Sequence, residues 1–453
     1  MRAEAVDREA GSARERLMVA IMFATWGLIF LDRMSVLYLA PYIARDLRLD
    51  DAQIGMLAGA VAVSWAVSAL LFGAISDRVG RKAVLVPMVV LFSVVSAASA
   101  FAQDFRQLLC LRALLGLAEG PCWSVMMALV EENSSPRHRG RNIGIVVSAA
   151  AVIGLAVAPV LTTQIAAHLG WRDALLMVAG PGAVLAILIG VFVTEVPRER
   201  RAAAHRSRAV DLLRLLKYRN LWASGIGAAG FMSWLFLVNT FGPLYITGVQ
   251  HESGTTAGLL MGAAGLGSFV LGLIAPAVSD RVGRRPMLAV CAALSIILPV
   301  AMLTHSLYGV LWLLAIVLFC TQAGQAISAI CIVLVPTESV PREYAATAIG
   351  FATLCGELIG GFLAPLVGGG LAQQYGLAVP LWIAAAGAGV VLIATLAMRS
   401  EGAAREAAGR GEDPMARRGA SPHLQAKSIR LGPWARFPFG SVAGGRSGPR
   451  TSR

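Results

Sequence analysis

Twelve apolar stretches, each long enough to cross a bilayer as a helix, occupy most of this 453-residue chain. The chain is 57% hydrophobic and only 14% charged, with a mean hydropathy of +0.69, whereas a soluble domain is about one quarter charged. A spanning helix needs about 20 residues, so the sequence predicts an all-α membrane protein with twelve transmembrane helices. The expected spans are residues 17–42, 53–75, 83–102, 108–130, 142–167, 174–194, 220–249, 256–278, 286–304, 307–335, 344–372 and 377–398.

The six-residue string Ser-Asp-Arg-Val-Gly-Arg occurs twice, at Ser76–Arg81 and at Ser279–Arg284. The copies lie 203 residues apart, and each fills a short gap between two apolar stretches. Identical residues at matching places indicate a duplicated bundle, which is the usual architecture of secondary transporters. A basic loop that recurs by chance is the weaker alternative.

Composition divides the chain into five segments. Six apolar stretches end by Thr194, six begin from Asn220, and the polar stretch between them carries eight Lys or Arg residues. The last 54 residues hold nine Gly and ten Lys or Arg, a composition that predicts disorder. The predicted segments are a cytoplasmic N-terminal segment (1–16), a six-helix half (17–194), a basic cytoplasmic linker (195–219), a second six-helix half (220–399) and a disordered cytoplasmic tail (400–453).

The net charge of +13 is distributed unevenly between the two ends of the spans. With the N-terminus inside, the inner segments before the tail hold 22 Lys or Arg residues and the outer loops hold four. Basic residues accumulate on the cytoplasmic side of membrane proteins. The pattern predicts a multi-pass protein of the cell membrane with both termini in the cytoplasm, in contact with lipid and not with nucleic acid.

Four charged residues fall inside predicted spans: Asp32 and Arg33 in the first, Arg112 and Glu119 in the fourth. Each costs about 2.5–3.5 kcal/mol at mid-bilayer when unpaired, so we expect pairing or a wet cavity. Arg112 and Glu119 are seven residues apart and share a helix face. A static ion-pair cross-link between the first and fourth helices is the alternative to a functional site.

The charges suggest a coupling mechanism. When Asp32 and Glu119 are ionised, they neutralise the two arginines; once the acids are protonated, Arg33 and Arg112 are free to bind a carboxylate in a bidentate fork. Proton and organic anion would then load and leave together. We therefore assign proton coupling to Asp32 and Glu119, and substrate binding to the two arginines.

The last six spans offer polar side chains in place of charges. Asn239 lies in the seventh span, and Gln322 and Gln325 lie three residues apart in the tenth, where they would share a face. We expect them to bind substrate hydroxyl groups, and hydrogen bonding between helices is an equal alternative. Glu357 in the eleventh span is either a third titrating group or a residue packed near the membrane edge.

The repeated string resembles the signature of the major facilitator superfamily. Gly73-x-x-x-Asp77-Arg78-x-Gly80-Arg81-Lys82 is similar to the motif between its second and third helices, and Asp280-Arg281-x-Gly283-Arg284-Arg285 to the echo between the eighth and ninth. Pro276 replaces the first Gly of the second copy, and charges that only set topology are the alternative. The resemblance implies a cytoplasmic gate formed by Gly73, Asp77, Arg78, Gly80, Arg81, Asp280, Arg281, Gly283 and Arg284.

Within that superfamily the chain is most similar to the anion:cation symporters, which carry hexonates, phthalates and sialic acid. The resemblance rests on Leu31-Asp32-Arg33, on the fourth-helix stretch Arg112–Pro121 and on Gly170-Trp171-Arg172. It implies that the matching acids carry protons and that the matching arginines bind or gate carboxylate. One departure is that the Trp usual near the Pro of the seventh helix is absent from Thr240–Tyr245.

Two other classes fit less well. A proton-coupled drug or metabolite antiporter of the same fold usually carries Gly-Pro-x-x-Gly-Gly in its fifth helix, and Ala158–Thr163 lacks those glycines. An enzyme is disfavoured because the sequence has no HExxH, P-loop or nucleophile elbow. The sequence therefore predicts a monomeric carrier, without cofactor or metal, that imports a small carboxylate such as a sugar acid or aromatic acid by proton symport with alternating access.

Overall fold

The computed structural model describes residues 2–135, 137–195, 217–341 and 344–398. These residues form helices and connecting turns, and no strand occurs among them. Twelve of the helices are long and apolar enough to cross a membrane, which confirms the predicted all-α fold with twelve spans. In chain order the spans are α1 (Arg2–Tyr38), α3 (Asp51–Val79), α4 (Arg81–Ser99), α5 (Phe105–Asn133), α6–η1–α7 (Arg139–Ala149, Ala150–Val157, Ala158–Leu169), α8 (Trp171–Phe192), α11 (Arg219–Gly248), α12 (Gly254–Val282), α13 (Arg284–Leu303), α14–α15–η3–α16 (Leu311–Thr321, Gly324–Ile327, Ser328–Leu334, Val335–Ser339), α17–η5–α18 (Ala345–Cys355, Gly356–Leu363, Ala364–Tyr375) and α19 (Ala378–Ala397).

The helix boundaries differ from the predicted segments at several places. The first helix begins at Arg2, inside the predicted N-terminal segment, and it ends at Tyr38, before the short helix α2 (Ala40–Leu47). Arg219 was assigned to the linker but starts α11, because a basic side chain at the membrane surface can extend a helix beyond its apolar run. Residues 196–216 of the linker and the tail, 400–453, lie outside the described residues.

Short polar residues start several of the helices. The Asp50 carboxylate accepts a hydrogen bond from the backbone N–H of Gln53 at 2.8 Å, and the Gln53 side chain accepts one from the backbone of Asp50 at 3.1 Å. This reciprocal pair is a capping box, which satisfies two backbone donors at the start of α3. Asp104 and Ser253 cap α5 and α12 through one hydrogen bond each.

The two copies of the repeated string adopt the same turn. Gly80 between α3 and α4 has φ +119°, and Gly283 between α12 and α13 has φ +95°. Side chains rarely tolerate this backbone region, whereas glycine adopts it readily. The repeated glycine is therefore explained by two equivalent sharp turns between successive spans.

The fifth and eleventh spans repeat one another in detail. Each consists of an α-helix, an eight-residue π-helical segment and another α-helix. Every boundary in the eleventh span follows its counterpart in the fifth by 206 residues. Both end at a glycine of positive φ, Gly170 and Gly376. The duplication seen in the sequence thus extends to an unusual helix geometry, and π-helical segments occur frequently at functional sites.

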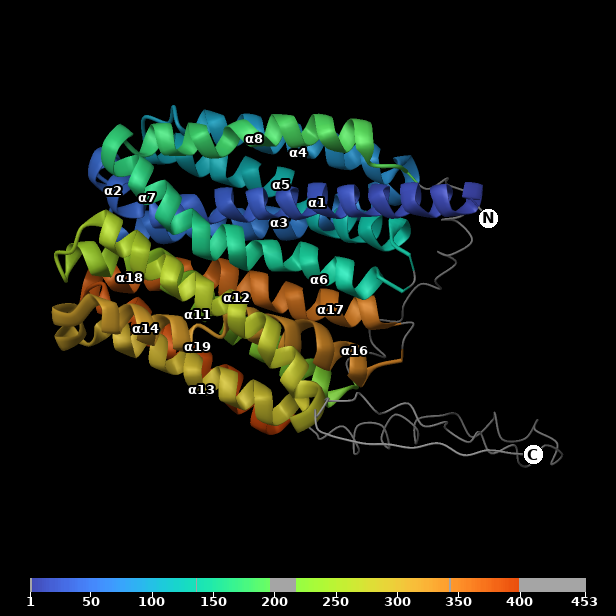
Figure 1. Ribbon diagram of the computed structural model, residues 1–453. Coiled ribbons are helices and arrows are strands. Elements are labelled where there is room, and N and C mark those ends of the chain that lie inside the picture. The colour runs from blue at the N-terminus through green and yellow to red at the C-terminus, as the bar shows by residue number, and fades with distance from the viewer. Residues whose placement is uncertain (1, 136, 196–216, 342–343, 399–453) are drawn as a thin grey trace, which may run out of the picture. The chain divides into compact units, whose positions relative to one another are not determined.

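The first six spans, blue to green in Figure 1, lie together beside the last six, yellow to red. Glycines allow close approach between the two sets. A Cβ on Gly55 of α3 would fall 2.2 Å from the Pro365 carbonyl oxygen of α18, and a Cβ on Gly265 of α12 would fall 1.9 Å from the Leu155 carbonyl oxygen of η1. Helix association in lipid depends on such close backbone contact, and here it holds the two sets together.

Candidate functional site

Asp32 and Arg112 form a buried pair between α1 and α5. Their side chains are 0% and 1% exposed, and Arg112 Nη2 lies 3.9 Å from Asp32 Oδ2. Ser96 of α4 donates a short hydrogen bond to Asp32, and Arg112 donates one of 3.5 Å to Ser99 of the same helix. The pair therefore joins three helices and faces the protein interior.

Arg33 turns away from Asp32 toward the last six spans. Its Nη2 donates a 2.8 Å hydrogen bond to Oε2 of Glu357 in η5, and each side chain is 5% exposed. Adjacent residues point about 100° apart on a helix, so one helix can serve two different partners. Glu357, for which the sequence leaves two readings open, is buried in the bundle beside Arg33.

Two aromatic rings flank the Arg33 guanidinium. Its central carbon lies 5.0 Å from the ring centre of Phe236 on α11 and 5.8 Å from that of Trp65 on α3. Cation–π attraction at these distances stabilises the guanidinium in one position. Neither ring was singled out from the sequence, because nothing local distinguishes them from other apolar residues of these spans.

Glu119 completes the group. Its side chain is fully buried, and among the described residues neither carboxylate oxygen has a hydrogen-bond partner. Asp32, Arg33, Arg112 and Glu357 all lie close enough to interact with it electrostatically. We call these five residues the charge cluster. The four residues selected from the sequence thus lie together, and the structure adds Glu357 as the fifth member.

A small cavity lies against the charge cluster. Arg33 and Arg112 both line it, and its volume of about 10 Å³ has room for about one water molecule. The other lining side chains are apolar: Val36, Leu37, Leu57, Ala58, Val61 and Phe236. The two arginines therefore face a common, nearly closed space with apolar walls.

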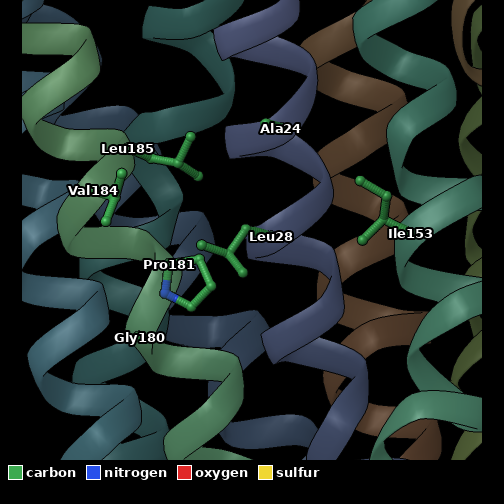
Figure 2. A pocket seen from close by; sticks show the side chains of 7 residues that line it. All are labelled: Ala24, Leu28, Ile153, Gly180, Pro181, Val184 and Leu185. Atoms are coloured by element: carbon green, nitrogen blue, oxygen red, sulfur yellow. The ribbon is translucent and has the colours of Figure 1, made fainter.

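A larger groove lies elsewhere, between α1, η1 and α8. Its volume is about 540 Å³, and Figure 2 shows Leu28 of α1 facing Pro181 and Val184 of α8 across it. Its lining is wholly apolar: Ala24, Leu28, Ile153, Gly180, Pro181, Val184 and Leu185. Because this groove offers no group that could neutralise an anion, the smaller cavity is the better candidate for an anion site despite its size.

The polar residues selected in the last six spans do not line the small cavity beside the charge cluster. They are Asn239, Gln322 and Gln325. Asn239 accepts a 2.7 Å hydrogen bond from the Tyr38 hydroxyl and donates one of 2.7 Å to the Leu235 carbonyl, so it links α1 to α11. Gln322 accepts a 3.0 Å bond from the backbone N–H of Gly324. Among the described contacts, both amides thus act within or between helices.

The expectation that Gln322 and Gln325 share a helix face is wrong. The chain leaves helical geometry at Gln322 and Ala323, between α14 and α15. The Gln325 side chain packs instead against Gly272 of α12. The break falls on the short polar stretch Thr321–Gln325, but the span as a whole stays apolar, so hydropathy averaged over the span did not reveal it.

The predicted cytoplasmic gate shows one interaction in both copies. Arg81 Nε donates a 2.8 Å hydrogen bond to Glu132 in the last turn of α5, and Arg284 Nη2 lies 2.9 Å from Glu338 in α16. Arg284 also lies 2.6 Å from Asp280. The equivalent arginine of each repeat therefore ties its turn to a glutamate at the end of the fourth or the tenth span.

Other members of the predicted gate contribute less. The side chains of Arg78 and Arg281 are exposed, and Gly80 and Gly283 supply the turns. The side-chain surroundings of Gly73 and Asp77 lie outside what the structure describes, so the latch role expected of Asp77 stays a prediction.

Comparison with known proteins identifies the family. A model described as Major Facilitator Superfamily matches residues 21–365. The chain belongs to this superfamily. A "Probable 4-methylmuconolactone transporter" of Cupriavidus pinatubonensis is 28% identical over 370 residues, which are 78% of this chain and 83% of the relative. A "Hexuronate transporter" of Bacillus subtilis is 28% identical over 252 residues, 53% of this chain and 60% of the relative.

The fold of this superfamily member is also found in solved transporters. The inward-facing, unoccupied structure of a bacterial homologue of the human lysosomal transporter Spinster has a TM-score of 0.65 and 19% identity, and covers 88% of this chain and 97% of that one. The family and the relatives are transporters rather than enzymes. The relatives agree with the sequence resemblance to anion:cation symporters.

Proposed function

We propose that this member of the superfamily imports a small organic anion together with protons, by alternating access to the charge cluster. The observation that carries the proposal is the convergence of Arg33 and Arg112 on one enclosed cavity. Guanidinium groups bind carboxylate through two parallel hydrogen bonds. Buried arginines in a membrane bundle are costly, and for that reason they mark functional sites by default.

The charge count of the cluster supports proton coupling. Three acids (Asp32, Glu119 and Glu357) face two arginines, so the fully ionised cluster carries a formal charge of −1. A substrate carboxylate adds a second negative charge in a region of low dielectric, where like charges repel strongly. Protons on the acids remove this repulsion, so proton and anion bind together. We assign the protons to Asp32 and Glu119.

The lining favours an acid with an apolar body. Six of the eight cavity residues are apolar, and the amides of Asn239 and Gln322 already have partners. A sugar acid would bring several hydroxyl groups into this space, and each one without a partner costs about 1–3 kcal/mol. Of the two relatives, the one named for a methylmuconolactone also matches more of the chain than the one named for a hexuronate. Both points support a flat, unsaturated or aromatic carboxylate.

The remaining parts of the proposal concern orientation. We place both termini and the two repeat turns on the cytoplasmic side of the cell membrane, because 22 of the basic residues counted lie at that end. The ties from Arg81 to Glu132 and from Arg284 to Glu338 each lie within one set of six spans, so they would brace the repeat turn of each set at the cytoplasmic side. The functional unit is proposed to be a monomer.

Uptake into proteoliposomes tests the proposal. Purified carrier should accumulate radiolabelled cis,cis-muconate, a flat dicarboxylate, when the vesicle interior is made alkaline, and a protonophore should abolish the accumulation. Glucuronate should compete poorly. Arg112→Gln should abolish uptake, whereas Arg137→Gln, an exposed arginine outside the cluster, should leave it unchanged. Muconate uptake that does not depend on the pH gradient would contradict proton coupling. The absence of any carboxylate uptake would contradict the proposed import of organic anions.

A further inference from the structure

Glu357 occupies the guanidinium of Arg33, which is the group that a substrate carboxylate would need. Arg33 lines the cavity, and its guanidinium already holds a carboxylate at 2.8 Å. That carboxylate belongs to the protein itself, from a segment 324 residues away. We propose that Glu357 is a tethered competitor, which binds Arg33 when the site is empty and is displaced by the carboxylate of the substrate. The inference rests on the proposed function.

The pair is built so that it can be exchanged. Glu357 engages Arg33 through one hydrogen bond, and the Arg33 Nε has no partner among the described residues. A carboxylate that bound through both of its oxygens would use the fork of the guanidinium more fully. The rings of Phe236 and Trp65 hold the guanidinium in place, so Arg33 need not move when its partner changes.

Glu357 lies on a segment whose glycines make room for its carboxylate. It is the second residue of the π-helical segment η5, between Gly356 and the glycines Gly360 and Gly361. A Cβ on Gly361 would fall 2.8 Å from Glu357 Oε2, so the glycine provides the space in which the carboxylate sits. A larger residue at that position would push the carboxylate out of place.

The acid is not required by the helix geometry. In the equivalent π-helical segment η1 of the fifth span, the residue 206 positions earlier is Ala151. An alanine therefore suffices for the same backbone, and the glutamate needs another explanation. Its side chain crosses to the first six spans, so displacement also breaks a link between the two sets of helices. Substrate binding and release of that link thereby become one event.

If Glu357 competes with the substrate, its removal should raise substrate affinity. Removal of a residue that binds the substrate or stabilises the fold should lower it. If the pair is formed about nine times in ten in the empty carrier, its removal should strengthen carboxylate binding about tenfold. The returning Glu357 would also expel the substrate. Glu357→Gln should therefore lower KM and kcat together in muconate counterflow, whereas loss of a binding group would raise KM.

The test measures cis,cis-muconate affinity of purified full-length carrier by tryptophan fluorescence, with counterflow in proteoliposomes. We expect about tenfold tighter binding for Glu357→Gln and a smaller gain for Glu357→Asp, whose shorter side chain withdraws the carboxylate from Arg33. Glu131→Gln, which removes an exposed glutamate paired with Arg139, should match the wild type.

Each outcome decides one question. If the wild type binds no carboxylate, the proposed function fails. If the wild type binds muconate but Glu357→Gln binds it equally or more weakly, the competitor role is overturned and the function stands. Should Glu357→Gln not elute as a monodisperse protein, Glu357→Asp takes its place, and loss of folded protein in both variants would overturn the proposal in favour of a structural role.

Discussion

Replacement of Glu119 by Gln should separate substrate movement from proton movement. In the structure neither Glu119 oxygen has a hydrogen-bond partner among the described residues, so the amide loses no bond and has nearly the same volume. We therefore expect the free energy of unfolding to change by no more than about 1 kcal/mol. The variant should fold and bind substrate, but it can no longer take up a proton at this position.

The magnitude follows from the gradient. One pH unit supplies about 1.4 kcal/mol per coupled proton, which corresponds to a tenfold accumulation ratio. With a gradient of about two units, the loss of one coupled proton should lower steady-state accumulation of muconate about a hundredfold. Counterflow with equal pH on both sides should stay within about twofold of the wild type, because exchange needs no net proton movement.

The assay compares Glu119→Gln with Glu131→Gln, which removes an exposed carboxylate from the same helix. Both variants are reconstituted, and gradient-driven uptake and counterflow are measured on the same vesicles. An accumulation ratio for Glu119→Gln equal to that of the wild type would refute the assignment of a proton to this residue. Equal loss of uptake and counterflow would refute it too, since it would indicate a binding or folding role.

Three further predictions concern packing, surface charge and the second arginine. A leucine at Gly265, where a Cβ would fall 1.9 Å from a carbonyl oxygen of η1, should lower the unfolding free energy by about 1–3 kcal/mol or more; a leucine at Gly389, with no neighbour within 4 Å, should not, and equal melting temperatures would contradict this. The hydrogen bond from Arg172 holds the pKa of Asp46 below its ordinary range, so this ion pair stabilises the fold at neutral pH. The stabilisation is lost as the pH falls from about 3.9, the pKa of an aspartate in the unfolded chain, through the lower pKa of Asp46 in the folded protein. Asp46→Asn should therefore cost at most about 1 kcal/mol at pH 7 and nothing in strong acid, and an undiminished cost in acid, measured by chemical unfolding, would refute the assignment. Arg112→Lys keeps the charge but loses the planar fork, so muconate binding should weaken about tenfold by fluorescence titration, and unchanged affinity would exclude bidentate binding there.

Much of this fold could be predicted because the membrane makes local composition decisive. Backbone groups in lipid must be satisfied within a helix, so long apolar runs define the spans without knowledge of their partners. The glycines of the repeated string follow from a backbone geometry that few other residues adopt. The convergence of Asp32 and Arg112 follows from the cost of leaving either charge alone in lipid.

What the sequence could not show depends on packing between distant segments. Glu357 becomes the partner of Arg33 only when the eleventh span lies against the first, and no spacing rule connects residues 324 positions apart. The break at Gln322 falls on a short polar stretch inside a span that is apolar on average, so averaged hydropathy predicted one continuous helix and a shared face that does not exist. The aromatic rings around Arg33 are likewise defined by contact and not by any local signal.

The central claim, that the charge cluster moves protons and a carboxylate as one unit, can be tested by following both at once. Carrier is reconstituted in vesicles that contain a pH-sensitive dye, without an imposed gradient, and cis,cis-muconate is added outside. The account predicts that the lumen acidifies as labelled muconate enters, and that the acidification per muconate falls to about half in Glu119→Gln, because Asp32 still carries its proton. Entry of muconate without acidification, or with alkalinisation, would contradict it.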